Sequence, residues 1–330
     1  MTNSTHQVLV APIQLHTHPN ADRLEVATIF AYRCVVQKGL YKDGDLVAYI
    51  PPDSVVDTER PEFAFLGVHN RIKAKKIRGV WSMGLILPSP PGSVEGQDVA
   101  EILGVTHYEP PEIGFNGKNL RRANSIAVPG MLNNLSKYDV DSLRRYPDFL
   151  EEGEPCWMVE KIHGANARLT FYQGKIYVGT RNRWVDPADE QCPWWNTLRA
   201  NSDLGAFLLK NPDILFYGEL FGDIQNMKYG CKPGERHFAF FDAFDLNSGG
   251  FLDLFQAWNL PAADTVTWAP CLYQGPYSFT KAEEHAEGTT TLIGSHHREG
   301  CVIRPLKETL DYRGNRKIMK LVSNTYLEKN

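Results

Sequence analysis

The sequence has few cysteines, no long apolar run and no excess of positive charge. Its six cysteines are scattered and form no C-x-x-C pair, which argues against a disulfide scaffold or a zinc site and is typical of reduced thiols in the cytosol. No apolar run approaches the roughly 20 residues of a membrane-spanning helix. The first residues also lack the basic start and apolar core of a signal peptide. We therefore expect a soluble cytoplasmic protein with no membrane partner.

The charge balance limits where a nucleic acid would bind. Thirty-five Lys and Arg residues against 39 Asp and Glu residues give a net charge of −4. A chain with this balance has no uniformly basic coat, so a nucleic-acid surface must be local. The hydrophobic content of 42% is that of an ordinary globular protein, and a length of 330 residues favours two domains over one.

Residues 1–110 have the pattern of a small β-domain. Short apolar runs alternate with turn signals such as HPNAD and KDGD, which predicts a small barrel or sandwich. Within this part, Arg71, Lys73, Lys75 and Lys76 precede Trp81. Strand alternation would put the first three of these cations on one face, where they would follow a phosphate backbone. The alternative is a solvated face of an antiparallel sheet.

Residues 111–150 have the composition of a linker. Proline and glycine are frequent at first, and from residue 132 the chain turns polar and is predicted to be partly helical. Lys118, Arg121 and Arg122 form a basic cluster for which a charged linker is the default interpretation, and contact with a substrate is the alternative.

The stretch WMVEKIHGANAR, residues 157–168, is the centre of the remaining chain. Apolar residues before and after it predict two strands joined by a tight turn at Gly164, with Lys161 at the mouth. Partial desolvation and neighbouring cations would lower the pKa of Lys161 and make it a nucleophilic amine. Taken alone, the same tetrapeptide K-I-H-G also fits a solvated lysine at a strand edge.

Further motifs follow in a fixed order. Arg181 comes shortly after a predicted hairpin strand, and Glu219 lies inside the apolar run ILFYGELFG, where a buried carboxylate needs a partner. An aromatic strand, FAFFDAFD, comes next, then Glu299 directly before the strand GCVIRP, and finally cations in RKIMKLV. Each motif taken singly has a structural explanation; their order does not.

This series resembles the covalent nucleotidyltransferases, and EKIHGANAR, YGELFG and EGCVIRP are most similar to the RNA ligase branch. HPNADRLEVATI and GDLVAYIPPDSVV resemble OB-fold modules of tRNA-binding proteins. An OB domain in first place is similar to the RNA ligase 5 family. The resemblance implies an α+β chain with an N-terminal OB-like β-barrel (1–110), a linker and helical entry (111–150), and an adenylyltransferase domain (151–330). That last domain would be ATP-grasp-like, with antiparallel sheets and flanking helices.

The resemblance also implies roles in nucleotide binding. Lys161 would attack the α-phosphorus of ATP, Glu160 would read the adenine amino group, and Phe241 would stack on adenine. Arg181 would hold the ribose or the nick end. The final family motif commonly reads K-x-K, and here either Lys317 supplies a missing charge beside Lys320 or Lys320 is the second lysine.

Metal binding and the later steps are implied in the same way. Glu219 would bind the ribose and help to place Mg²⁺ or Mn²⁺, and Glu299 would hold the catalytic metal through water. His163 and Asn166 match positions used when the 3′-OH attacks the activated 5′ end. His163 stands where DNA ligases and capping enzymes carry Asp, which favours an RNA ligase.

The expected function is ATP-dependent sealing of 3′-OH and 5′-phosphate ends in nicked or broken RNA, as in RNA repair, with no obligate protein partner evident. Two alternatives stay open at this point. One is an mRNA guanylyltransferase-type enzyme, which would transfer GMP. The other is a non-catalytic RNA-binding protein with a tRNA-binding-like OB module.

Overall fold

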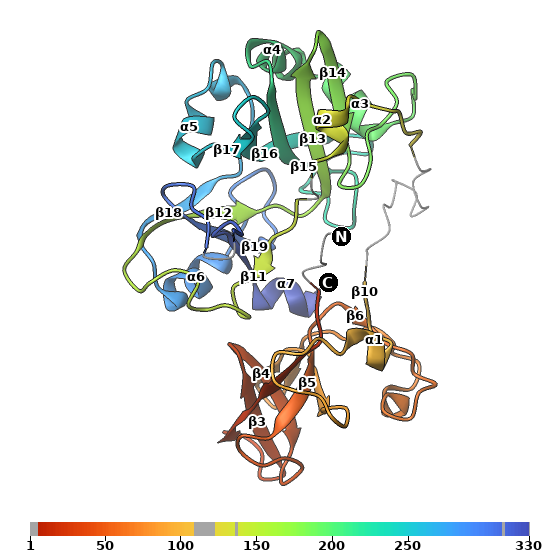
Figure 1. The fold of residues 1–330 in the computed structure, drawn as a ribbon, viewed down its shortest axis with the longest axis vertical. Coiled ribbons are helices and arrows are strands. Elements are labelled where there is room, and N and C mark those ends of the chain that lie inside the picture. The colour runs from red at the N-terminus through yellow and green to blue at the C-terminus, as the bar shows by residue number, and fades with distance from the viewer. Residues whose placement is uncertain (1–5, 109–122, 136–137, 312–313, 330) are drawn as a thin grey trace.

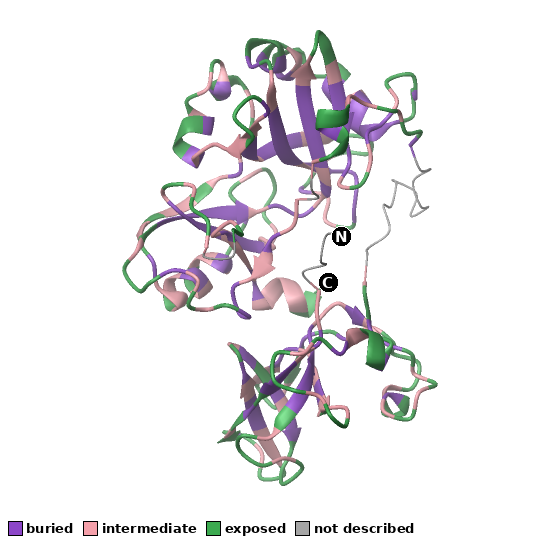
Figure 2. Ribbon diagram, viewed as in Figure 1, coloured by how far each residue is buried: buried purple, intermediate pink, exposed green. Residues whose placement is uncertain are grey.

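The computed structural model describes residues 6–108, 123–135, 138–311 and 314–329. In Figure 1 the N-terminal strands form one body, and the later chain forms two further sheets stacked beyond it. Figure 2 shows that the buried residues follow the strands and that the exposed residues follow the loops and helix surfaces. The architecture is α+β and dominated by antiparallel pairing.

The N-terminal body consists of short strands in small sheets ordered β1-β5-β9, β2-β3-β4, β7-β8 and β10-β6. In β4, buried Tyr32, Cys34 and Val36 alternate with more exposed residues, as a strand covering a core requires. The strands are β1 (Leu9–Pro12), β2 (Gln14–Thr17), β3 (Leu24–Ile29), β4 (Tyr32–Gln37), β5 (Leu46–Ile50), β6 (Ser54–Val55), β7 (Lys75–Ile77), β8 (Val80–Ser82), β9 (Leu85–Pro88) and β10 (Thr106–His107). A short helix, α1 (Ala100–Leu103), and a 3₁₀ turn (Ala64–Leu66) complete this body.

The connection to the second part contains one short helix among its described residues. The only helix in its described residues up to 150 is the single turn α2 (Gly130–Asn133). In the described residues 138–140 no helix precedes β11 (Asp141–Ser142), which pairs in parallel with a distant strand, β20. The expected linker with a helical entry over residues 111–150 stays a prediction, because residues 109–122 and 136–137 lie outside the described part of the chain. The basic cluster at 118, 121 and 122 lies outside the described residues.

Two five-stranded sheets make up the second part, ordered β11-β20-β19-β12-β18 and β14-β13-β15-β16-β17. Their remaining strands are β12 (Pro155–Lys161), β13 (Ala165–Tyr172), β14 (Lys175–Gly179), β15 (Ile214–Gly222), β16 (Arg236–Asp245), β17 (Gly250–Phe251), β18 (Cys271–Pro276), β19 (Gly300–Pro305) and β20 (Met319–Val322). Each strand expected from the motif series is present.

Helices flank these sheets: α3 (Pro193–Arg199), α4 (Ser202–Lys210), α5 (Leu254–Trp258), α6 (Phe279–Ala286) and α7 (Asn324–Lys329), with a 3₁₀ turn at Ala263–Thr265. The Asn201 side chain caps α4 by accepting from the Leu204 backbone N–H. Leu204, Phe207 and Leu208, spaced three and four residues apart, then bury one face of α4 in the core between helix and sheet. No helix in the described part of the chain is long and apolar enough to cross a membrane.

The predicted turn at Gly164 joins β12 to β13, but the two strands belong to different sheets and do not pair with each other. A Cβ atom on Gly164 would lie 2.3 Å from the Leu220 carbonyl oxygen on β15. Only glycine therefore allows the chain to cross at this point. As a consequence, the residues around Gly164 lie where the two sheets meet.

The N-terminal body contacts the second part through hydrogen bonds and through apolar packing. The backbone N–H of Ala31 donates to the Arg144 carbonyl oxygen at 2.8 Å, and the Tyr32 hydroxyl donates to Ser142 Oγ at 2.8 Å. Leu327 of α7 packs against the hydrophobic core of the N-terminal body. In Figure 1, α7 lies between that body and the sheet containing β12.

Candidate active site

A cavity of about 600 Å³ lies where the two sheets of the second part meet the N-terminal body. Its lining comes from β12, β13, β15, β16, β19, β20 and α7, from loops of the second part and from the N-terminal body. Most of the residues singled out from the sequence lie on its wall: Glu160, Lys161, His163, Asn166, Arg181, Glu219, Phe241, Glu299, Lys320, Arg71 and Lys73. Lys75, Lys76 and Lys317 are not part of this lining.

Lys161 is the last residue of β12 and is paired with a carboxylate. Register places Lys161 opposite Gly300 of β19, so Glu299 arrives beside it. Lys161 Nζ lies 2.6 Å from Glu299 Oε1. Burial alone would lower the pKa of Lys161, but the charges of Glu299 and Glu219 outweigh burial and raise it. The predicted lowering was therefore wrong for this state, because carboxylates surround the amine more closely than cations do.

Glu219 and Asn166 face each other across β13 and β15. Burial raises the pKa of Glu219 to about 8, with Lys161 opposing and Glu299 reinforcing the shift. Asn166 Oδ1 is buried and accepts no hydrogen bond from the residues that the structure describes. An unsatisfied buried acceptor beside two carboxylates is unfavourable unless a ligand or cation completes the set.

These oxygen donors fit a hard divalent cation. Mg²⁺ and Mn²⁺ prefer carboxylate, amide and water oxygens, and Mg²⁺ in particular keeps much of its water shell. Glu219, Glu299 and the unsatisfied Asn166 Oδ1 supply that chemistry. Burial raises the pKa of Glu219 and so disfavours its carboxylate form. A bound cation would stabilise that carboxylate.

His163 is held by three groups that sequence reasoning missed. Its backbone N–H donates to the Tyr229 hydroxyl at 2.8 Å. Its ring lies with Nε2 2.8 Å from Asn226 Oδ1 and Nδ1 2.9 Å from the Tyr326 hydroxyl. Burial lowers the pKa of His163. No motif pointed to these partners, which come from a loop after β15 and from α7.

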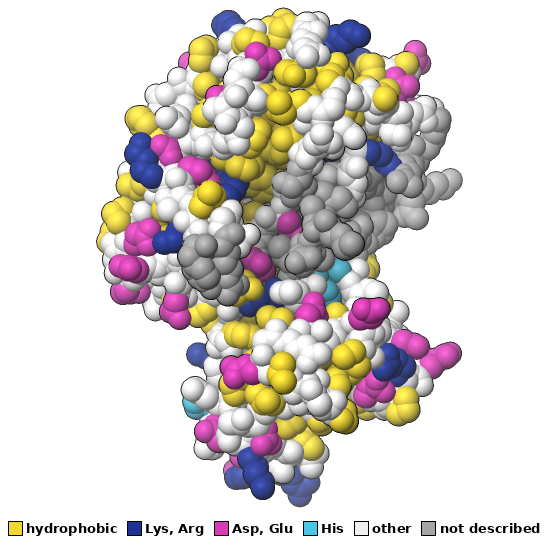
Figure 3. Space-filling view, in the orientation of Figure 1, with side chains coloured by type: hydrophobic (Ala, Val, Ile, Leu, Met, Phe, Trp, Pro, Cys, Tyr) yellow, Lys and Arg dark blue, Asp and Glu magenta, His cyan; other side chains and the backbone are white. Residues whose placement is uncertain are grey.

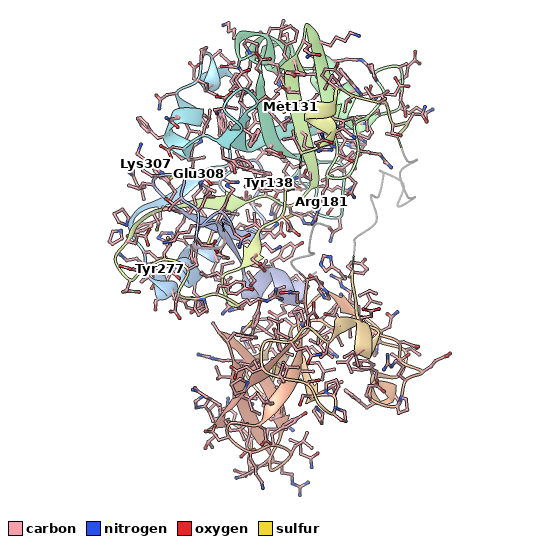
Figure 4. All side chains as sticks on the ribbon, viewed as in Figure 1. Met131, Tyr138, Arg181, Tyr277, Lys307 and Glu308 are labelled. Atoms are coloured by element: carbon pink, nitrogen blue, oxygen red, sulfur yellow. The ribbon has the colours of Figure 1, made fainter. Side chains whose placement is uncertain are left out.

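Asp139 was also missed. Its Oδ2 lies 2.9 Å from Arg181 and its Oδ1 lies 4.0 Å from Lys320 Nζ. Burial lowers the pKa of Lys320, with Asp139 opposing the shift. Lys317 instead has its Nζ 3.9 Å from Glu154, so of the two lysines left open by the final motif only Lys320 lies in the cavity. Figure 4 shows Arg181 and Tyr138 in the region between the two sheets of the second part.

Phe241 and Glu160 form two further parts of the wall. The ring centroid of Phe241 lies 5.1 Å from that of Tyr138. Glu160 is buried, and both of its carboxylate oxygens accept hydrogen bonds from a loop before β19: one from Thr290 Oγ1, the other from the Thr291 N–H at 2.9 Å and Oγ1 at 2.8 Å. This loop therefore fixes the orientation of Glu160.

Only part of the predicted basic face of the N-terminal body lines the cavity. Buried Ile72 and Ala74 alternate with exposed lysines as expected, but regular strand begins only at Lys75. Arg71 pairs with Asp53 at 2.6 Å, and its guanidinium lies 3.8 Å from the centre of the Tyr108 ring. Lys76 Nζ lies 5.8 Å from the Trp81 ring, outside the cavity. On the face seen in Figure 3, cationic and acidic side chains are interspersed.

Comparison with known proteins places this geometry in a family. A family model described as RNA ligase matches residues 154–322, and an OB-fold domain model matches residues 8–89. No curated protein matches the chain. Since the first model covers more than half of the chain, this protein belongs to the RNA ligase family.

Solved structures of Naegleria gruberi RNA ligase have the same fold. A variant of that enzyme with ATP and Mn matches with a TM-score of 0.82 at 24% identity, covering 98% of this chain and 99% of that chain. Its complex with PPi matches with a TM-score of 0.80 at 24% identity, covering 98% of each chain. A variant with AMP and Mn matches with a TM-score of 0.82 at 23% identity, covering 99% of each. The predicted α+β fold with an N-terminal OB domain is thereby confirmed, as is the resemblance to RNA ligases.

Proposed function

We propose that this protein is an ATP-dependent RNA ligase that joins 3′-OH and 5′-phosphate ends through a covalent Lys161–AMP. The observation that carries the proposal is the placement of Lys161. It ends β12 inside one cavity, with Glu219 and Glu299 on one side and Arg181 and Lys320 among the other lining residues. Phosphoryl transfer needs in-line placement and charge neutralisation more than acid–base groups, and the cations on this wall would supply the neutralisation.

The first step would use the amine of Lys161. The Lys161 ammonium would first lose a proton to solvent; the neutral Nζ would then attack the α-phosphorus of ATP and form a P–N bond as the bond to the β-phosphate oxygen breaks, so that pyrophosphate and a second proton leave. In the structure the ammonium is stabilised by Glu299 at 2.6 Å, so this contact must loosen before attack. Lys320 and Arg181 would neutralise phosphate charge as it develops.

Adenine and ribose recognition would fall to the same wall. Phe241 would stack on the base, Glu160 would accept from the adenine amino group, and Glu219 would bind the ribose. The loop holding Glu160 through Thr290 and Thr291 supports this role, since a carboxylate that reads a base must be held in one orientation. A divalent cation, Mn²⁺ or Mg²⁺, would be held by Glu219, Glu299 and Asn166 and would neutralise phosphate charge. The matching Naegleria structures contain ATP or AMP with Mn.

In the later steps the adenylyl group moves to RNA. A 5′-phosphate oxygen attacks the AMP phosphorus and breaks the P–N bond, and the RNA 3′-OH then attacks the activated 5′ phosphorus and releases AMP. His163 and Asn166 would act in this joining step. Arg71 and Lys73 of the OB domain line the same cavity and would contact the RNA phosphates, together with Lys75 and Lys76 beyond it.

An end-joining assay tests the proposal. RNA with a 3′-OH and a labelled 5′-phosphate is incubated with the protein, a divalent metal and either ATP or GTP. We expect ATP alone to convert the label into a form resistant to phosphatase, in a product that migrates as joined RNA. Failure to join ends with ATP would contradict the proposal, and label that GTP makes phosphatase-resistant without forming joined RNA would indicate the capping alternative.

A further inference from the structure

The ring of His163 is hydrogen-bonded on both sides. Nε2 lies 2.8 Å from Asn226 Oδ1, and Nδ1 lies 2.9 Å from the hydroxyl of Tyr326. A carbonyl oxygen only accepts, so Nε2 must carry the proton in this contact. In the neutral ring Nδ1 then presents a lone pair, to which the Tyr326 hydroxyl donates. The two bonds together select one tautomer and prevent the ring from flipping.

Tyr326 reaches this position from the far end of the chain. The Tyr326 N–H donates to Ser323 Oγ at 3.0 Å, and the Asn324 N–H donates to Glu287 Oε1 at 2.6 Å, which ties the start of α7 to the second part of the molecule. The next residue, Leu327, packs against the core of the OB domain. Helix α7 is therefore held by both domains while its tyrosine faces the cavity.

The contact between Tyr326 and His163 combines ring packing with a hydrogen bond. The Tyr326 and His163 rings also touch, with centroids 5.6 Å apart, so the phenyl ring alone supplies the packing. The hydroxyl adds the bond to Nδ1. The Tyr326 side chain lines the cavity beside Lys161 and Glu299, so its hydroxyl acts at the reacting groups rather than within a separate core.

We propose that Tyr326 is a positioning residue that orients His163 for the RNA-joining step and makes that orientation depend on the docking of α7 between the two domains. This inference rests on the proposed ligase function. Formation of Lys161–AMP needs no proton donor or acceptor from His163, so loss of the Tyr326 hydroxyl should affect joining more than self-adenylylation.

The test compares Tyr326→Phe with wild type in two separate reactions. In the first, labelled ATP is added and the Lys161–AMP adduct is measured. In the second, RNA with a pre-adenylylated 5′ end is supplied without ATP, and joining is measured. We expect the first rate to change by less than about threefold and the second to fall about tenfold, the effect of losing one oriented hydrogen bond. Equal loss in both reactions, or unchanged joining, would overturn the inference.

Two controls accompany this variant. Tyr277→Phe also removes one hydroxyl, which donates to the Pro147 carbonyl oxygen away from the cavity, and should leave both rates unchanged. His163→Ala should lose joining, and adding Tyr326→Phe to it should cause no further loss, because the hydroxyl acts only through the imidazole. If the two substitutions caused additive losses of joining, Tyr326 would not act through His163, and the inference would be contradicted.

A spectroscopic readout separates this inference from the ligase function. Imidazole ¹⁵N spectra of histidine-labelled protein, assigned with His163→Gln, should show a single Nε2–H tautomer for His163 and a mixture in Tyr326→Phe. If wild type neither self-adenylylates nor joins RNA, the proposed function fails whatever the spectra show. If wild type joins RNA and the tautomer is the same in both proteins, the positioning role fails alone.

Discussion

At the scale of single residues, cationic side chains of the cavity are paired with carboxylates, and the phosphates of a bound nucleotide would compete for these cations. Lys161 is paired with Glu299, and Arg181 is paired with Asp139 at 2.9 Å. Lys161 and Arg181, which would meet the phosphates of ATP, thus already contact carboxylates of this chain. Phosphates entering the cavity would compete with these carboxylates, and the outcome depends on how strongly each pair is held.

Asp139→Asn tests this competition. The substitution removes the negative charge near Arg181 and Lys320 while keeping the side-chain shape. Since phosphates would no longer displace a carboxylate, we expect the KM for ATP in self-adenylylation to fall about threefold, a change in keeping with a partly exposed ion pair. The comparison is made by initial-rate labelling of Lys161. A rise in KM would show that Asp139 helps to place Arg181 for the nucleotide.

A substitution at a second residue, Asp242, should change the stability of the protein. It is buried on β16, with Oδ1 3.1 Å from Arg304 of β19 and Oδ2 2.8 Å from Arg316, so it joins the two sheets. Asp242→Asn leaves the buried guanidinium of Arg304 and the partly buried guanidinium of Arg316 without that carboxylate. We expect a loss of about 3–5 kcal/mol in the free energy of unfolding at neutral pH, measured by urea denaturation.

The ion pairs of Asp242 also predict how the stability of the protein depends on pH. Burial alone would raise the pKa of Asp242, but Arg304 and Arg316 outweigh burial and lower it. Its stabilising effect is therefore complete above the unfolded pKa of about 3.9 and is lost as pH falls through the lower folded value. The stability difference between wild type and Asp242→Asn should stay constant from neutral pH to about pH 5 and shrink in stronger acid. A difference that grows on acidification would contradict this account.

At the scale of elements, the active site depends on the chain crossing from one sheet to another at Gly164. The crossing puts Lys161 and His163 within three residues of the junction, and β19 and β15 then bring Glu299 and Glu219 to them through strand register. The site is therefore assembled by pairings between segments that are distant in sequence.

Gly164→Ala tests the crossing. The added Cβ would meet the Leu220 carbonyl oxygen at 2.3 Å and Glu219 Cγ at 2.9 Å, and the backbone atom cannot move without shifting β15. We expect a stability loss of about 2 kcal/mol and a loss of self-adenylylation that exceeds the unfolded fraction. Gly205→Ala is the matched control, because nothing lies within 4 Å of its Cβ and α4 should gain slightly in stability. Wild-type activity in Gly164→Ala would refute the close approach.

What could be predicted from the sequence follows from this assembly. The apolar runs around Lys161 and Glu219 predicted their strands, and the order of motifs predicted the family. The raised pKa of Lys161 could not be predicted, because it depends on Glu299 arriving by register 138 positions later in the chain. Asp139 and Tyr326 belong to no recognisable motif, and only the tertiary fold brings them to the cavity.

At the scale of the whole molecule, the OB domain completes the cavity wall. Arg71 and Lys73 line it, while Lys75 and Lys76 lie beyond it, although all four are close in sequence. The domain boundaries at residues 110 and 150 stay a prediction, since much of the connection lies outside the described residues. The docking of Tyr32 onto Ser142 supports a fixed relation between the domains.

Lys73 and Lys75 form a matched pair for testing the RNA contact. Both are exposed lysines on the same side of one extended segment, and only Lys73 lines the cavity. We expect Lys73→Ala to weaken binding of 5′-phosphorylated RNA more than Lys75→Ala and to reduce the slope of log K against log salt by about 0.7, the value for one phosphate contact on a single strand. Equal effects of the two variants would argue for diffuse attraction instead of a defined path.

The central claim is that Lys161 becomes covalently attached to AMP. Purified wild type, Lys161→Ala and Lys161→Arg are each incubated with α-labelled ATP and Mn²⁺, denatured and separated on a gel, with folding checked by circular dichroism. The account predicts label on wild type only, because arginine keeps the positive charge but provides no nucleophilic amine. Label that persists on folded Lys161→Ala, or no label on folded wild type, would contradict the account.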